Sequence, residues 1–119
     1  MAELPVELTP RQVADLIGDG ATQLVDVREP YEHEAGRITG DVHIELERLT
    51  LEAGSIDRDR PVVFYCRSGD RSTMPAEAFR ASGWEAYTLD GGLAAWVEAG
   101  QPIEPEEGEV ANRRPGPQT

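Results

Sequence analysis

The sequence contains no lysine, only one cysteine and only two histidines. The absence of lysine excludes Schiff-base chemistry, lysine-anchored pyridoxal phosphate and the lysine-bearing phosphate loop of nucleotidases. The single thiol, Cys66, excludes an internal disulfide and a site built from several thiolates. His33 and His43 lie in separate segments without evident ligand partners, so we interpret them as ordinary surface or hydrogen-bonded core histidines. We therefore expect neither a metal site nor another cofactor.

Positive charge and long apolar stretches are also scarce. The chain has 23 acidic residues against 11 basic ones, all of them arginine, and a net charge of −12. Without a basic stripe, such a chain is not expected to bind nucleic acid or an anionic membrane surface. No apolar run has the length of a membrane span, and the first residues lack the basic start of a secretory signal. We predict a cytoplasmic protein whose lone thiol stays reduced.

The remaining residues show the pattern of one α/β domain. At 119 residues the chain has the length of a single domain. Short β-rich segments alternate with segments of helical periodicity, which predicts an open, mostly parallel sheet with helices on both faces. We place this domain at residues 1–102. From residue 103 onward proline, glycine and charge dominate, so we predict a disordered tail over residues 103–119.

Local signals fix several of the element boundaries. Thr9 and Gln12 have the spacing of a capping box around Pro10, which predicts that a helix starts there. Gly83 has the position of a residue that ends a helix. The expected strands cover residues 6–8, 23–27, 41–44, 61–65 and 86–89, and the expected helices include 30–35, 72–82 and a last one that begins at about residue 93.

The most informative segment joins a buried strand, a cysteine and the start of a helix. Cys66 directly follows the apolar run Pro61–Tyr65, and the loop after a parallel strand is where ligands bind in α/β sheets. Gly69 permits a tight turn that can direct backbone N–H groups inward, and the following helix adds the positive end of its dipole. Arg67 and Arg71 add two positive charges. All these features stabilise a thiolate, so we predict that Cys66 is a nucleophile in an anion-binding cup.

We expect the rest of this loop to bind the substrate, namely Arg67, Ser68, Gly69, Asp70, Arg71 and Ser72. Some of these residues have other readings. Arg67 can point to solvent, and the two serines can shape the turn or cap the helix rather than donate to the sulfur. Asp70 opposes a thiolate, so we expect it to turn outward or to pair with an arginine. The alternative for Cys66 itself is an inert, buried core residue.

Three further features have mainly structural interpretations. Asp26 and Arg28 follow a strand closely enough to reach the site, but we favour an ion pair that ties strand-end loops together. Trp84 and Trp96 are interpreted as packing residues rather than substrate walls. The Gly91-Gly92 pair predicts a tight turn before the last helix.

Four segments, taken together in this order, resemble the rhodanese-like family of single-domain sulfurtransferases. They are Leu24–Arg28, Gly36–Ile44, Cys66–Ser72 and Gly91–Trp96, and the resemblance covers roughly residues 4–103. The second segment departs from the family pattern, because the family more often has histidine, proline and alanine where this chain has Arg37, Thr39 and Asp41. The cysteine loop matches fully.

The resemblance implies a five-stranded α/β domain and a thiosulfate sulfurtransferase in which Cys66 carries a persulfide. A small anionic sulfane-sulfur donor such as thiosulfate charges the cysteine, and cyanide, a thiol or a protein acceptor unloads it. A second reading is a sulfur carrier or interaction module with little turnover. Cysteine-dependent phosphatases and arsenate reductases are the enzymatic alternative, but they have five residues between cysteine and arginine. Here four residues separate Cys66 from Arg71, a ring better suited to a single sulfur atom.

Overall fold

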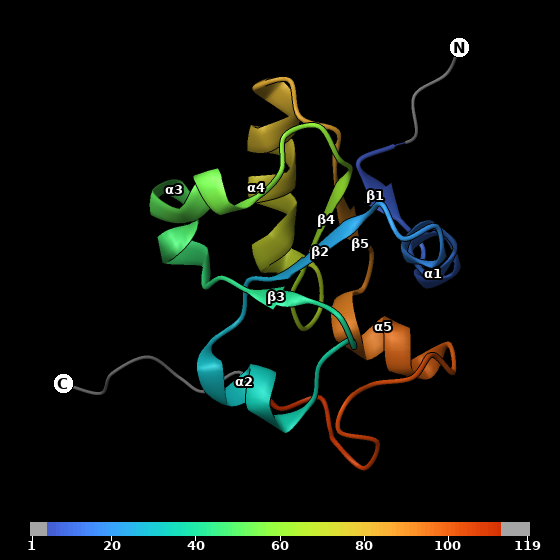
Figure 1. The fold of residues 1–119 in the computed structure, drawn as a ribbon. Helices are drawn as coiled ribbons and strands as arrows, with labels where there is room; N and C mark the ends of the chain where they lie inside the picture. Colours follow the sequence, from blue (N-terminus) through green and yellow to red (C-terminus); the bar gives the residue numbers. More distant parts are fainter. Residues whose placement is uncertain (1–4, 113–119) are drawn as a thin grey trace, which may run out of the picture.

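The computed structural model describes residues 5–112, which form one five-stranded sheet flanked by helices (Figure 1). The strand order is β1-β5-β4-β2-β3, and every strand pair in this part of the chain is parallel. This confirms the predicted α/β class and its five strands. The strands are β1 (Glu7–Leu8), β2 (Gln23–Asp26), β3 (Val42–His43), β4 (Val62–Tyr65) and β5 (Ala86–Leu89).

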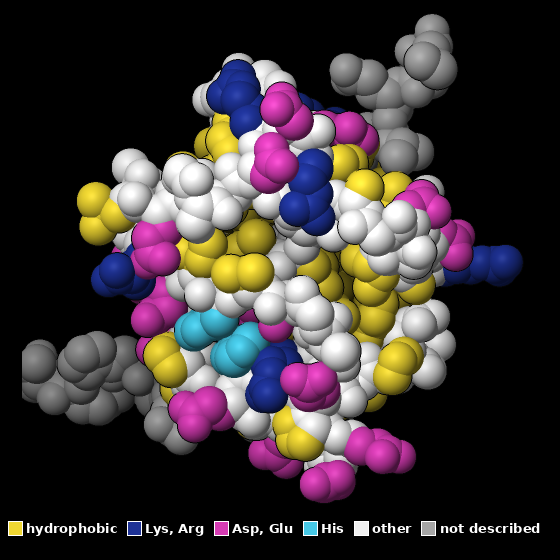
Figure 2. All heavy atoms as spheres, viewed as in Figure 1, with side chains coloured by type: hydrophobic (Ala, Val, Ile, Leu, Met, Phe, Trp, Pro, Cys, Tyr) yellow, Lys and Arg dark blue, Asp and Glu magenta, His cyan; other side chains and the backbone are white. Residues whose placement is uncertain are grey.

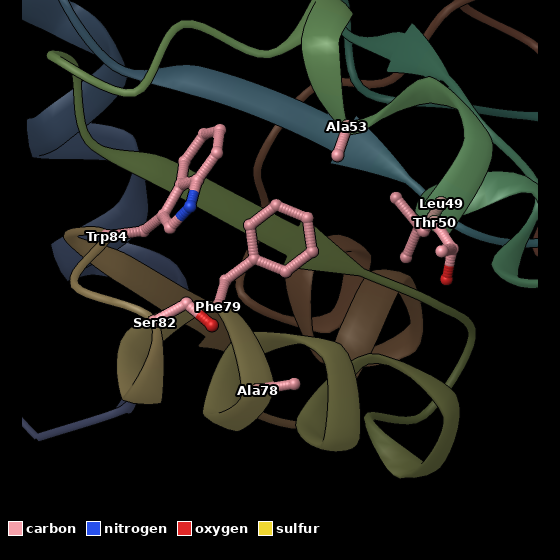
Figure 3. A pocket seen from close by; sticks show the side chains of 7 residues that line it. All are labelled: Leu49, Thr50, Ala53, Ala78, Phe79, Ser82 and Trp84. Carbon is pink, nitrogen blue, oxygen red and sulfur yellow. The ribbon is translucent and has the colours of Figure 1, made fainter.

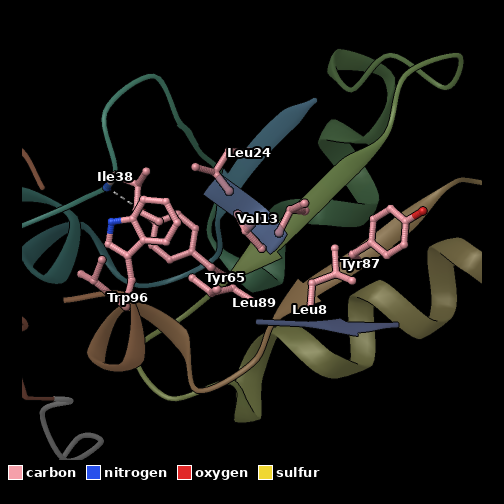
Figure 4. Packing of buried hydrophobic residues seen from close by; sticks show 10 residues of the cluster. Leu8, Val13, Leu24, Ile38, Tyr65, Tyr87, Leu89 and Trp96 are labelled. Atoms are coloured by element: carbon pink, nitrogen blue, oxygen red, sulfur yellow. Dashed lines mark hydrogen bonds between the residues drawn. The ribbon is translucent and has the colours of Figure 1, made fainter. Parts of the chain in front are cut away.

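The helices cover both faces of the sheet, as the alternating sequence pattern predicts. On one face, Val13 of α1 and Trp96 of α5 join the cluster of Figure 4. On the other face, Leu49 of α3 and Ala76 of α4 pack with Phe64. The α-helices are α1 (Pro10–Gly18), α2 (Pro30–Ala35), α3 (Leu49–Glu52), α4 (Asp70–Ala81) and α5 (Gly92–Glu98), and short 3-10 turns cover Leu46–Arg48 and Ala53–Ser55.

The central strand β4 separates the two packed layers. Its side chains alternate between the two faces, so that Val63 and Tyr65 enter one cluster while Val62 and Phe64 enter the other. All four residues are buried, as expected for a strand covered on both sides. Cys66 directly follows β4, so it lies at the carboxyl end of the central strand of the sheet.

The capping box that opens α1 is present as predicted. The Thr9 hydroxyl accepts a hydrogen bond from the Gln12 amide, and the Gln12 side chain accepts one from the Thr9 amide. This exchange satisfies two backbone donors that would otherwise lack partners at the helix start. Leu8 and Val13, on either side of the cap, are both fully buried.

The helix after the cysteine begins two residues earlier than predicted. Gly69 has a φ of 103°, a left-handed conformation that glycine adopts without strain, and α4 starts at Asp70. The Gly69 carbonyl accepts hydrogen bonds from both the amide and the hydroxyl of Thr73. The loop is thereby shortened to Cys66–Gly69, and Asp70 and Arg71 lie on the first helical turn.

Residues 103–112, which belong to the predicted tail, contact the domain. Arg37 and Glu104 exchange two backbone hydrogen bonds, and the Glu109 amide donates to the Ala35 carbonyl. Ile103 and Val110 pack against the cluster of Figure 4, so two apolar side chains anchor an otherwise polar segment. Residues 113–119 of the predicted tail lie outside the described residues. Each helix within residues 5–112 is too short or too polar to traverse a lipid bilayer.

Candidate active site

Cys66 lies where the chain leaves β4, and its sulfur has polar neighbours despite full burial. Its Sγ accepts a hydrogen bond from the Gly69 amide at 3.0 Å, and the Ser72 hydroxyl oxygen lies 3.5 Å away. The thiol donates to Asp70 Oδ1 at 3.7 Å. Cys66 also belongs to an apolar cluster that includes Phe64. The sulfur is therefore shielded from bulk water while keeping two potential hydrogen-bond donors.

The backbone arrangement differs from the expected ring of inward-facing amides. The Gly69 amide donates to Sγ. The amides of Asp70 and Arg71 interact instead with the Asp70 carboxylate, which also accepts a hydrogen bond from the exposed Ser68. Burial opposes ionisation of Asp70, but these hydrogen bonds and the Arg71 charge outweigh it and lower the pKa of Asp70. A protein carboxylate thus occupies part of the anion-binding position at the start of α4.

Arg71 is held by a buried carboxylate that the sequence analysis missed. Its two terminal nitrogens donate to the two oxygens of Glu32 in α2, at 2.8 and 2.9 Å. Glu32 is fully buried and Arg71 nearly so. Burial opposes ionisation of Glu32, but the hydrogen bonds from Arg71 and from the Glu29 amide lower the pKa of Glu32 below its ordinary value. This pairing reduces the expected freedom of Arg71 to bind an anion, and its buried Nε–H has no hydrogen-bond partner among residues 5–112.

Arg67 is half-buried rather than fully exposed to solvent. One of its terminal nitrogens donates to the side-chain oxygen of Asn112 at 3.0 Å, so the segment 103–112 reaches the cysteine loop. Its Nε is buried and has no hydrogen-bond partner among the described residues. In the described part of the chain, the Nε–H groups of Arg67 and Arg71 are therefore both buried and unpartnered.

The start of α5 is hydrogen-bonded to the cysteine loop. The Leu93 amide donates to the Cys66 carbonyl at 2.8 Å, and the Ala94 amide donates to the Arg67 carbonyl at 3.0 Å. A Cβ atom on Gly92 would lie 2.5 Å from the Cys66 carbonyl oxygen, so only glycine permits this approach. The Gly91-Gly92 pair therefore fixes the cysteine loop in addition to making the predicted turn.

We predict that Gly92→Ala destabilises the protein by about 2 kcal/mol more than Gly100→Ala. Both glycines have positive φ, 62° and 82°, so both substitutions strain the backbone. Only the Gly92 side chain meets the loop, because nothing lies within 4 Å of a Cβ on Gly100. Urea unfolding of the two variants measures the difference. Equal losses would show that the close contact with the loop contributes nothing beyond backbone strain.

A second polar cluster occupies the ends of β2 and β3. Asp26 and Arg28 form the expected ion pair, fully buried, with hydrogen bonds of 2.8 Å to both carboxylate oxygens. His33 Nδ1 lies 2.9 Å from Asp26 Oδ2, an oxygen that Arg28 also contacts, and Tyr65 donates to Asp41 at 2.5 Å. Burial opposes ionisation of Asp26, but these partners lower its pKa, whereas burial raises the pKa of Asp41.

The two histidines belong to this network. Their rings stack with centroids 4.5 Å apart, and His43 Nε2 lies 2.6 Å from the Arg28 carbonyl. Figure 2 shows them side by side on the face seen there. Ligand atoms of Asp26, His33 and Asp41 lie within 4.8 Å of one another, a grouping that the sequence analysis did not foresee. Each of the three already has a hydrogen-bond partner within the protein, and the Arg28 charge beside Asp26 opposes a cation there.

The two tryptophans differ in their surroundings. Trp96 is buried and donates to the Pro102 carbonyl, in keeping with a packing role. Trp84 and Phe79 line an apolar surface hollow of about 260 Å³ between α3 and α4 (Figure 3). None of the residues that line the hollow belongs to the cysteine loop. We assign it no part in the chemistry at Cys66.

Comparison with known proteins agrees with this geometry. Residues 9–99 match the family model of the rhodanese-like domain. The chain is 34% identical to the thiosulfate sulfurtransferase GlpE of Pseudomonas aeruginosa over 97 residues, which cover 81% of this chain and 87% of that protein. It is 43% identical to the uncharacterized protein YqhL of Bacillus subtilis over 75 residues, covering 62% of this chain and 60% of YqhL. A rhodanese-related protein from Thermoplasma volcanium superposes with a TM-score of 0.77 at 26% identity, covering 83% of this chain and 97% of that one.

Proposed function

The chain belongs to the rhodanese-like domain family, and from this premise we propose that it is a sulfurtransferase that carries sulfane sulfur on Cys66. The observation that carries the proposal is the position of Sγ at the carboxyl end of β4, within hydrogen-bond distance of the Gly69 amide and the Ser72 hydroxyl. Both groups can donate to an anionic sulfur. The name of the Pseudomonas aeruginosa relative supports thiosulfate as the donor.

In the charging step, the Cys66 thiolate attacks the outer sulfur of thiosulfate. A new S–S bond forms to Sγ, the S–S bond within thiosulfate breaks, and sulfite leaves with the bonding electron pair. Sulfite is a good leaving group, so the step needs no general base. This suits a site in which neither histidine contacts Sγ within residues 5–112.

In the unloading step, cyanide or a thiolate attacks the outer sulfur of the Cys66 persulfide. The new bond forms to the acceptor, the persulfide S–S bond breaks, and its electron pair returns to Sγ as thiolate. The Gly69 amide receives this charge without reorganisation, because its position is fixed by the turn at the start of α4.

The two arginines give the site its attraction for an anionic donor. The chain carries a net charge of −12, so attraction has to come from groups close to Cys66. Arg67 and Arg71 each have a buried Nε–H that lacks a hydrogen-bond partner within residues 5–112, and the Arg71 charge interacts with Cys66. We assign these N–H groups to the sulfonate end of the donor. Ser68, Gly69, Asp70 and Ser72 complete the proposed substrate-binding residues.

Mass spectrometry of the intact protein tests the proposal. After incubation with thiosulfate and removal of excess donor, we expect a mass gain of one sulfur atom that cyanide removes with release of thiocyanate. Cys66 is the only cysteine, so a gain that is reversed by cyanide can be assigned to it.

Two other outcomes would change the assignment. A persulfide that forms but transfers only to a protein acceptor would identify a sulfur carrier with little turnover of small molecules. Hydrolysis of an aryl phosphate, with no mass gain from thiosulfate, would overturn the sulfurtransferase proposal in favour of a phosphatase.

A further inference from the structure

Two buried hydroxyl groups form a chain of contacts that leads to the Cys66 sulfur. Ser72 Oγ, on the first turn of α4, is 3.5 Å from Sγ and 2.6 Å from Thr88 Oγ1. Ser72 is fully buried and Thr88 is 1% exposed. Nothing in the sequence pattern singled out Thr88, which lies in the short strand β5.

Thr88 occupies a place where an apolar residue would serve the fold better. It alternates along β5 with Tyr87 and Leu89, which pack into the opposite layer. On its own face, Ala86 belongs to the apolar cluster that also contains Cys66. A hydroxyl at such a position is costly to bury unless it makes a hydrogen bond. Its partner within residues 5–112 is Ser72.

The backbone holds the Thr88 hydroxyl in a fixed position. The Thr88 amide donates to the Val6 carbonyl at 2.8 Å, and the residue is paired with Glu7 of β1 and with Phe64 of β4. A strand paired on both sides has little freedom to move. Thr88 therefore offers Ser72 a hydrogen-bond partner whose position is fixed by the sheet.

The number of available hydrogens determines which of the two hydroxyl groups donates to the other. If Ser72 donated its single hydrogen to Thr88, the buried Thr88 hydrogen would have no acceptor among the described residues. If Thr88 donates to Ser72, both hydrogens find acceptors, because the Ser72 hydrogen is then free for Sγ. The Ser72 hydrogen has a second possible acceptor, the Gly69 carbonyl at 3.4 Å. This carbonyl is neutral, so a charged sulfur attracts the hydrogen more strongly.

We infer that Thr88 is a positioning residue for the chemistry at Cys66: its hydroxyl donates to Ser72 and so turns the Ser72 hydroxyl toward the sulfur. The inference rests on the proposed role of Cys66 as a nucleophile. The hydrogen bond from Ser72 to Sγ stabilises the thiolate more than the persulfide. In the persulfide, the negative charge lies on the outer sulfur and not on Sγ. Hydrogen bonds in a chain also strengthen one another, so loss of the first weakens the second.

The test measures how fast iodoacetamide alkylates Cys66 across a range of pH. Alkylation needs the thiolate but no sulfur donor, so its result is independent of whether the protein turns over thiosulfate. The variants are Thr88→Val, which removes the hydroxyl at constant shape, Thr88→Ser, which keeps it, and Ser72→Ala. Thr50→Val makes the same change at an exposed position.

We expect Ser72→Ala to slow alkylation at neutral pH by about tenfold and Thr88→Val by about threefold, with both pH profiles displaced to higher pH. Thr88→Ser and Thr50→Val should match the unmodified protein. In the Ser72→Ala background, Thr88→Val should have no further effect, because Thr88 acts through Ser72.

A purely structural Thr88 would give a different result. Unchanged alkylation in Thr88→Val, or an equal slowing with and without Ser72, would overturn the inference. Thr88→Ala, which introduces no new side-chain volume, takes the place of Thr88→Val if the valine variant does not fold. Circular dichroism establishes which variants are folded before alkylation is measured.

Discussion

The Cys66→Ser variant is expected to lose thiosulfate–cyanide sulfur transfer by about a thousandfold or more while keeping its fold. The hydroxyl of serine can still accept the hydrogen bond from the Gly69 amide, so the loop retains its anchor. It is a poor nucleophile toward sulfur, however, and it cannot form a persulfide. Steady-state thiocyanate production measures the loss, and circular dichroism reports the fold.

A chemical block at the same atom provides the matched control. Because Cys66 is the only cysteine, alkylation of the wild-type thiol removes the same nucleophile without changing the sequence. The alkylated protein and the serine variant should be equally inactive. Turnover that survives in either one would place the reacting group elsewhere and would remove the basis for the proposed function.

Features encoded by neighbouring residues could be predicted from the sequence. The capping box at Thr9, the buried strand before Cys66 and the alternation of strands and helices each depend on a few adjacent side chains. These signals fixed the sheet class and placed the cysteine at the carboxyl end of a strand. The ion pair of Asp26 with Arg28 was predictable for the same reason, since the two residues lie two positions apart.

Features that join distant segments could not be predicted in this way. Glu32 and Arg71 are 39 positions apart, and although Pro30 marks Glu32 as the N3 residue of a helix, nothing near it indicates a pairing with Arg71. The contact of Gly92 with the cysteine loop likewise depends on how α5 packs under β4. The polar composition of the tail likewise does not indicate that Ile103 and Val110 pack against the domain.

The buried pair of Glu32 and Arg71 changes the electrostatic picture of the site. A free arginine would add a full positive charge beside the sulfur, but Glu32 compensates much of it at 2.8 Å. Asp70 adds a second carboxylate close to Sγ. In the proposed mechanism, the thiolate is therefore stabilised more by directed hydrogen bonds from Gly69 and Ser72 than by net positive charge. This is why the orientation of the Ser72 hydroxyl has consequences for reactivity.

Glu32→Gln is expected to lower the free energy of unfolding by about 3 kcal/mol at neutral pH. The substitution preserves shape but removes the carboxylate charge that pairs with the buried Arg71 guanidinium. Glu34→Gln, in the same helix but exposed, is the matched control and should change stability by less than about 0.5 kcal/mol. Urea unfolding followed by tryptophan fluorescence measures both.

The pH dependence of this difference distinguishes a charge pair from a packing defect. The pKa of Glu32 is lowered in the folded state from its ordinary value of 4.5, so ionised Glu32 stabilises the fold above that value. As pH falls through the lowered pKa, wild-type Glu32 takes up a proton and this stabilisation is lost. Protonated glutamic acid and glutamine are then nearly equivalent beside Arg71, so the two stability curves should converge in acid. The other carboxylates titrate in both proteins, so their contributions cancel in the difference between the two free energies of unfolding. A gap that stayed constant down to the acid limit would mean that the glutamine variant is destabilised by shape and not by charge.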